Sequence, residues 1–188
     1  MDSLLPALLA AALAAFGDRP QRLAAVLADR FGSPGIVIAA VFVAALAASA
    51  IAAIGAQLVS PMLPHDGATL LLALALLFAG ATSLFPARKL DTVEGWKMGA
   101  FVTSALAMFI LMFGDSAAFL TFGIAARGTL PAAAAIGAAV GMTAAIAPAA
   151  LMGAEFERIV PVRGIRLFAA ALFLTAGLWC ALMALTFI

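Results

Sequence analysis

Charged residues are scarce in this sequence. Only 10% of its 188 residues are charged and 66% are hydrophobic, which gives a mean hydropathy of +1.22. Soluble domains are about one quarter charged and about one half apolar. A folded chain of this size has too little interior to hide so much apolar surface from water. The shortage of charge therefore excludes a soluble fold and indicates an integral membrane protein.

The few polar residues that are present exclude further classes. Ten Lys and Arg against nine Asp and Glu leave a formal net charge of +1, so no long-range field would recruit a nucleic acid partner. Cys180 is the single cysteine and can form no internal disulfide. The sequence has no Cys/His cluster, no phosphate-binding glycine loop and no nucleophile elbow. We therefore expect no enzymatic activity and no resident cofactor.

A cleavable signal peptide is not expected either. The first sixteen residues are apolar and rich in alanine, but a signal peptide starts with positive charge, and Asp2 is the only charged residue before Asp18. We expect this stretch to stay in the mature chain as part of the first transmembrane helix.

Six apolar runs are long enough to cross a bilayer, which takes about 20 residues. They cover residues 4–28, 34–59, 67–85, 96–126, 131–152 and 165–187. Short polar or Pro/Gly-containing segments connect them, so helices that are consecutive in the sequence should be antiparallel neighbours. The predicted fold class is an all-α integral membrane protein of six transmembrane helices.

The loops predict the orientation of the chain in the membrane, since Lys and Arg gather in cytoplasmic loops. If loops one, three and five share a side, that side carries Arg30, Arg88, Lys89, Lys97, Arg158, Arg163 and Arg166. The opposite side carries only Arg127. We therefore expect both termini outside the cytoplasm, in a multi-pass protein of the bacterial inner membrane.

The two halves of the chain resemble each other. Phe16-Gly17-Asp18 aligns with Phe113-Gly114-Asp115 at an offset of 97 residues (115 − 18). At the same offset Arg30 aligns with Arg127 and Pro34 with Pro131. A unit of three spans must have its copies inserted in opposite directions, so residues 1–94 and 95–188 are predicted to be inverted three-helix repeats of one membrane domain. Secondary transporters build a midplane site from interrupted helices in this way.

Asp18 and Asp115 are the acidic residues embedded in the predicted spans. A carboxylate inside a bilayer costs about 2.5–3.5 kcal/mol, so it is usually functional. Gly17 and Gly114 precede them, loosen the helices and expose carbonyl oxygens. Carboxylates with carbonyls and hydroxyls suit hard divalent cations such as Ca²⁺, Mn²⁺ or Mg²⁺. The two aspartates are the predicted binding residues for a cation and for protons.

Neighbouring residues leave alternatives open. Asp18 could instead cap the helical segment that begins near Pro20, and its charge could be neutralised by Arg19 or Arg22. Gln21, Ser116 and Thr121 could add oxygen ligands, although Ser and Thr in membrane helices more often bond back to their own backbone.

These motifs resemble the hallmark of a known family. The first copy reads Ala15-Phe16-Gly17-Asp18-Arg19-Pro20-Gln21, and the second reads Met112-Phe113-Gly114-Asp115-Ser116-Ala117. Both are similar to the Glu-hydrophobic-Gly-Asp-Lys/Arg-Ser/Thr consensus of the six-helix Golgi and bacterial manganese/calcium transporters. These are the Gdt-type cation/proton exchangers of the lysine-exporter superfamily. The resemblance covers essentially the whole chain.

The departures from the consensus bear on the substrate. Ala15 and Met112 stand where the family has glutamate, and the basic residue of the motif is kept only as Arg19. The resemblance implies cation binding by the Glu and Asp of both motifs, of which only Asp18 and Asp115 carry over. Met112 could offer sulfur, but a thioether suits Cu(I) better than Mn²⁺ or Ca²⁺.

Two functions remain in competition. The first is a secondary transporter of manganese or calcium, exchanged for protons, with an eroded cation site; Arg19, Gln21, Ser116, Gly17 and Gly114 would support its two aspartates. The second is a non-transporting paralogue that keeps the fold and acts as a partner or regulator of another membrane protein. The expected partners are the lipid bilayer, a small cation and protons, and a homo-oligomer is left open.

Overall fold

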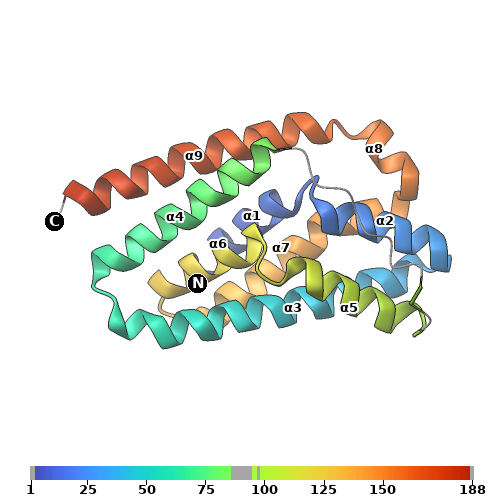
Figure 1. Ribbon diagram of the computed structural model, residues 1–188, viewed down its shortest axis with the longest axis horizontal. Coiled ribbons are helices and arrows are strands. Elements are labelled where there is room, and N and C mark those ends of the chain that lie inside the picture. Colours follow the sequence, from blue (N-terminus) through green and yellow to red (C-terminus); the bar gives the residue numbers. More distant parts are fainter. Residues whose placement is uncertain (1–2, 86–94, 97, 187–188) are drawn as a thin grey trace.

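The computed structural model describes residues 3–85, 95–96 and 98–186, and all secondary structure in these ranges is helical (Figure 1). The α-helices are α1 (Leu4–Ala15), α2 (Arg19–Phe31), α3 (Pro34–Val59), α4 (His65–Leu84), α5 (Ala100–Met112), α6 (Ser116–Arg127), α7 (Pro131–Met152), α8 (Phe156–Ile159) and α9 (Val162–Thr186). Two 3₁₀ turns, η1 (Ser60–Met62) and η2 (Gly153–Glu155), follow α3 and α7. The predicted all-α class is confirmed.

Four helices in the described part of the chain are long and apolar enough to cross a membrane. They cover residues 34–62, 66–84, 131–152 and 162–185, and α5 with α6 is a fifth candidate, bent by 65° at its break. The predicted bounds of the second and fifth runs match α3 and α7, and each of these helices has a proline in its first turn, where the missing N–H costs nothing. The first predicted run is divided into α1, of 12 residues, and α2, which carries Arg22, Asp29 and Arg30. Six spans therefore remain a prediction.

Helix α7 lies at the centre of the bundle and packs against α1, α2, α3 and α6. Gly137 and Gly141 on α7 face the backbone of α1 at Leu4 and Leu8. A Cβ at Gly141 would lie 2.9 Å from the carbonyl carbon of Leu8, which is closer than real Cβ contacts. Small residues thus bring the two backbones together where lipid provides no hydrophobic drive for helix association.

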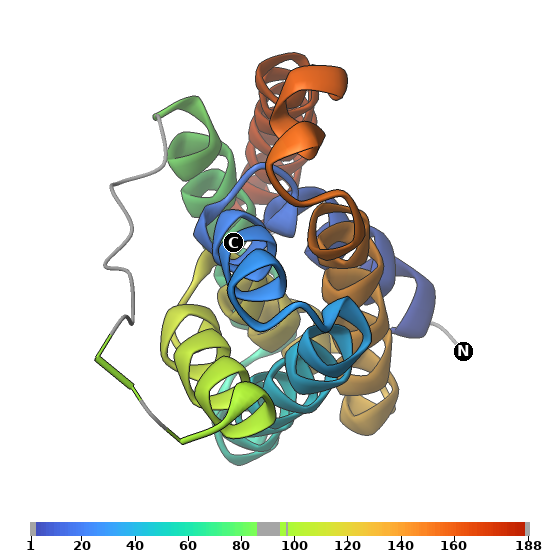
Figure 2. The same cartoon turned by 90° about the vertical axis from the view of Figure 1, so that its right-hand side faces the viewer.

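Helices α4 and α9 form an antiparallel pair along one edge of the molecule (Figures 1 and 2). A Cβ at Gly80 would lie 2.7 Å from Cγ of Leu174, and a Cβ at Gly177 would lie 3.0 Å from Cγ of Leu77. The two contacts are reciprocal, because Gly177 and Leu174 lie 97 residues after Gly80 and Leu77 (177 − 80 and 174 − 77).

The remaining helix contacts also occur in corresponding pairs when α1, α2, α3 and α4 are matched with α5, α6, α7 and α9. Helix α1 packs on α7 as α5 packs on α3, α2 packs on α7 as α6 packs on α3, and α1 packs on α6 as α5 packs on α2. Two pairs depart from this pattern among the described residues. Helix α4 packs against α6, whereas α9 hardly touches α2, and α1 has a small contact with α9, whereas α5 has almost none with α4.

The ends of the molecule carry different charges. The α2–α3 turn with Arg30 and the α8–α9 region with Arg158, Arg163 and Arg166 lie toward the right of Figure 1. Helix α6, which ends at Arg127, runs toward the left, where η1 also lies. Positions 88, 89 and 97 lie outside the described residues. Which end faces the cytoplasm stays a prediction.

Candidate cation site at two helix breaks

The Phe-Gly-Asp segments form two breaks of nearly identical backbone geometry. Phe16 has φ −71° and ψ 125°, and Phe113 has φ −70° and ψ 116°. Gly17 and Gly114 follow with φ of 72° and 76°, in the left-handed region that favours glycine. These angles are typical of a type II turn, which needs positive φ at its third residue. Each turn ends one helix and starts the next.

The aspartate that closes each turn also begins the second helix of its pair. The amide N–H of Asp18 donates to the Ala15 carbonyl at 3.4 Å, and that of Asp115 to the Met112 carbonyl at 3.3 Å. Asp115 Oδ1 also accepts the N–H of Ser116 at 2.6 Å, so its side chain caps α6. The Asp18 side chain makes no capping hydrogen bond, although its residue holds the N-cap position of α2. Asp18 therefore caps α2 through its backbone and not through its carboxylate.

Both aspartates line one cavity of about 720 Å³. Its apolar wall comes from α4 and α5 with the residues that follow them, and its polar lining consists of Asp18, Arg19, Thr82, Asp115, Ser116 and Arg166. Gly114 lines it as well. The structure therefore brings together five of the seven residues that the sequence proposed for the site. The other two, Gly17 in the first break and Gln21 on α2, do not line this cavity.

Two positive charges face the two carboxylates in this cavity. Arg19 and Arg166 line it together with Asp18 and Asp115, and Asp18 and Arg19 are close enough to act electrostatically on Asp115. A cation entering here meets lining charges that sum to zero. In the described ranges no group of three or more His, Cys, Asp or Glu side chains could hold a metal. Any further ligands must be hydroxyls, backbone carbonyls or water.

The positions of the family's glutamates do not lie in the cavity lining. Ala15 and Met112 are each 2% exposed and belong to the helical core. The side chain of Met112 is therefore buried in the helical core, outside the lining of this cavity.

Gln21 links the first break to α7 through two hydrogen bonds to backbone groups. Its Oε1 accepts the N–H of Gly17 at 2.7 Å, and its Nε2 donates to the carbonyl of Ala145 on α7. The side chain is 2% exposed. Both ends of the amide are thus occupied, and Gln21 fixes the Gly17 turn to the central helix. Thr121 similarly donates back to the Ala117 carbonyl at 2.8 Å, as membrane threonines often do.

Replacing Gln21 with leucine should destabilise the protein. The substitution leaves the Gly17 N–H and the Ala145 carbonyl without their partner, and an unsatisfied buried polar group costs about 1–3 kcal/mol. We expect a fall of several degrees in the apparent Tm of the detergent-solubilised protein. Gln57→Leu on the exposed side of α3 is the matched control. An equal change in both variants would contradict the bridging role.

Arg166 and Thr82 are polar residues of the cavity lining that sequence reasoning missed. In the sequence analysis Arg166 contributes only to the loop charges that predict the orientation of the chain. A signal was available, because Arg166 is the single charged residue of the predicted run 165–187. The reasoning that selected the embedded aspartates applies equally to an embedded arginine.

Comparison with known proteins gives two matches. The family described as "Divalent cation/proton antiporter GDT1" matches residues 3–91 and 100–186. The "Putative manganese exporter" of Vibrio cholerae serotype O1 (strain ATCC 39541 / Classical Ogawa 395 / O395) is 33% identical over 180 residues, which are 95% of this chain and 90% of that protein. No solved structure matches the chain significantly.

Proposed function

The chain belongs to the GDT1 family of divalent cation/proton antiporters, and from this membership we propose that it carries Mn²⁺ across the membrane in exchange for protons, through the cavity that Asp18 and Asp115 share. The observation that carries the proposal is the convergence of both aspartates, each at a helix break, on one cavity of about 720 Å³. Cation transport follows from the family. The ion, the proton coupling and the binding residues are our proposal.

The chemistry of the cavity fits this cargo. Carboxylate oxygens, the Thr82 and Ser116 hydroxyls and water form the hard-oxygen environment that Mn²⁺ accepts. We propose manganese in place of calcium because a relative that covers nearly the whole chain carries the name "Putative manganese exporter". A carboxylate can hold a cation or a proton, so competition for Asp18 and Asp115 would couple the two flows.

We also propose the architecture that such exchange needs, namely residues 1–94 and 95–188 as inverted three-helix repeats. Three structural observations support it: the matching turns at the two breaks, the reciprocal contacts between α4 and α9, and the corresponding pairs of packed helices. In addition, the two segments of the chain that match the family begin 97 residues apart (100 − 3). In this architecture α1 with α2 is the sixth span. Rocking one repeat against the other would alternate access to the cavity.

Manganese flux into proteoliposomes tests the function directly. Purified protein should carry Mn²⁺ faster than empty liposomes, and a proton gradient of opposite direction should accelerate the flux. Proteoliposomes loaded with a Ca²⁺-sensitive dye, in place of the Mn²⁺-sensitive dye, measure Ca²⁺ flux, so the two ions can be compared with the same protein preparation. A Mn²⁺ flux that does not change with the proton gradient would contradict the proposed cation/proton exchange.

A second candidate is the paralogue that keeps the fold without transporting. One observation favours it: the lining charges of the cavity sum to zero, and both positions of the family's glutamates are apolar and buried. Folded protein that gives no flux above empty liposomes would support this function in place of the first.

A further inference from the structure

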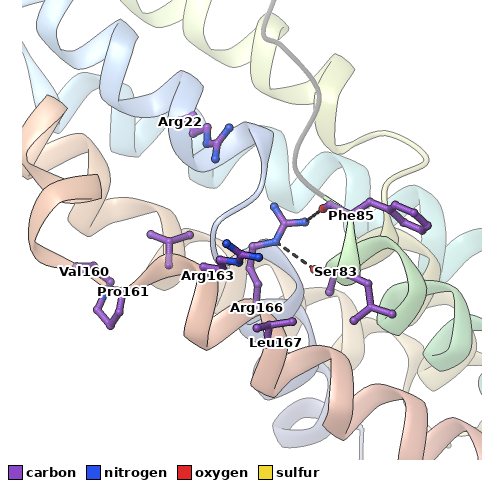
Figure 3. Close-up of a pocket in the computed structure, with 10 residues that line it drawn as sticks. Arg22, Ser83, Phe85, Val160, Pro161, Arg163, Arg166 and Leu167 are labelled. Carbon is purple, nitrogen blue, oxygen red and sulfur yellow. Dashed lines mark hydrogen bonds between the residues drawn. The ribbon is translucent and has the colours of Figure 1, made fainter.

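Arg166 ties the first helix break to the end of α4. From the second turn of α9, its Nη1 donates to the carbonyl of Gly17 at 2.9 Å. Its Nε donates to the Ser83 carbonyl at 3.4 Å, and its Nη2 donates to the carbonyls of Thr82, at 3.3 Å, and of Phe85. Figure 3 shows the guanidinium reaching the carbonyls of Ser83 and Phe85. One side chain thus joins α9, α4 and the turn between α1 and α2.

Arg166 also stands between two cavities. It lines the cavity of Asp18 and Asp115 and a second one of about 670 Å³, which opens between α2, the end of α4 and the start of α9 (Figure 3). Phe85 is the other residue that borders both. A small cavity of about 20 Å³ lies behind Arg166 and is bordered by Ala14 and Asp18. The arginine and the phenylalanine are thus common to the linings of the two larger cavities.

The two helix breaks differ in what covers them. A Cβ at Gly17 would collide with the side chain of Val162 and lie 2.8 Å from Cδ of Arg166. A Cβ at Gly114 would meet no atom of the described residues within 4 Å. The first break is therefore covered by α9, and the second is open to the cavity. The repeat offset matches Arg166 with Thr69 on α4 (166 − 97), which has neither the length nor the charge to make the same contacts.

We propose that Arg166 is a positioning residue of the transport cycle, a latch that closes the carboxylate cavity on the side of the first break and must release Gly17 and the end of α4 when that side opens. The inference rests on the proposed transport function. In a transporter built from inverted repeats, access alternates between the two sides. The second break should therefore become covered when the first is uncovered. A divalent cation held by Asp18 and Asp115 repels the guanidinium, so loading of the cavity favours release.

The latch can be tested by thiol accessibility in a Cys180→Ala background, which removes the native thiol. Ala14→Cys places a reporter behind the latch, at a position 6% exposed. Phe113→Cys places one at the open break, at a position 56% exposed that lines the carboxylate cavity. A water-soluble methanethiosulfonate labels the protein in nanodiscs, where both faces are accessible. With Arg166 intact, Phe113→Cys should react fast and Ala14→Cys slowly.

Arg166→Gln should shift the labelling rates of the two reporters in opposite directions. We expect labelling of Ala14→Cys to rise about tenfold, as a tenfold shift in the population of the released state would give, while labelling of Phe113→Cys falls. Arg163→Gln is the matched control. Arg163 lies on the same helix and lines the second cavity, of about 670 Å³, but its side chain is exposed. It should change neither rate by more than about twofold. Arg166→Lys keeps the charge without the planar fork and should give a smaller shift in the same direction.

Opposite changes at the two reporters are the result that a merely structural role would not give. Faster labelling of both reporters in Arg166→Gln would mean local unfolding and would overturn the latch, as would two unchanged rates. If Arg166→Gln does not fold, the Arg166→Lys rates decide by the same criteria. Labelling needs neither ion nor flux, so a failed latch and a failed transport function give separate results.

Discussion

Asp115→Asn should abolish manganese flux, with a loss of at least about a hundredfold in rate. The substitution removes one of two carboxylates from a cavity that also contains Arg19 and Arg166, so the lining becomes net positive. An opposite charge near 4 Å is worth about 4 kcal/mol at an effective dielectric constant of 20, and every 1.4 kcal/mol is about tenfold. A divalent cation would then be repelled from the site. Mn²⁺ uptake into proteoliposomes measures the effect.

The fold should tolerate this substitution. An asparagine side chain keeps an oxygen that can accept the Ser116 N–H, and Asn is a favoured N-cap residue. Asp18→Asn should give a similar loss of flux, since it removes the other carboxylate. Asp29→Asn, on the exposed last turn of α2, is the matched control and should keep its flux. Flux in Asp115→Asn above about a tenth of the unmodified rate would mean that this carboxylate does not bind the cation.

Alanine at the two break glycines should have unequal effects on stability. Both Gly17 and Gly114 have positive φ, where any L side chain costs about 1–2 kcal/mol. Gly114→Ala should lose only this amount, because no other part of the chain that the structure describes lies within 4 Å of its Cβ. Gly17→Ala would in addition push its methyl group into Val162 and Arg166, and such overpacking typically costs about 1–3 kcal/mol more.

The free energy of unfolding in detergent, obtained from titration with a denaturing surfactant, measures this difference. Gly164→Ala on α9 is the control for a helical glycine with open surroundings, and it should be neutral or slightly stabilising. Equal losses at Gly17 and Gly114 would show that α9 does not press on the first break, and would also weaken the case for Arg166.

Much of this fold could be predicted from local sequence. Uninterrupted apolar runs that start at Pro34 and Pro131 gave the bounds of α3 and α7, because length and a first-turn proline define such helices by themselves. The glycines at positions 17 and 114 marked the two breaks, since a turn with positive φ is a local requirement. The first span was harder, because the charges of α2 reduce its apolar character.

The candidate site was less accessible to sequence reasoning. The repeat predicted that Asp18 and Asp115 would lie near each other, and the structure places both on one cavity, although their role remains a proposal. The sequence offers one signal for Arg166, the single charge of the run 165–187, but a basic residue at the start of an apolar run is also typical of a helix flank. Only the fold brings the carbonyls of Gly17 and Thr82 within its reach. The difference between the two breaks likewise depends on tertiary contacts alone.

The lengths of α3 and α9 link the protein to the thickness of its bilayer. At about 1.5 Å per residue, the 26 residues of α3 and the 25 residues of α9 extend about 39 and 37 Å. The hydrocarbon core of a typical bilayer is about 30 Å thick. The part of each helix that exceeds this core is accommodated by tilt, by thicker lipid or by the interfacial region. Since Arg166 lies near one end of α9, hydrophobic mismatch that changes the tilt of this helix also moves the guanidinium relative to the Gly17 carbonyl.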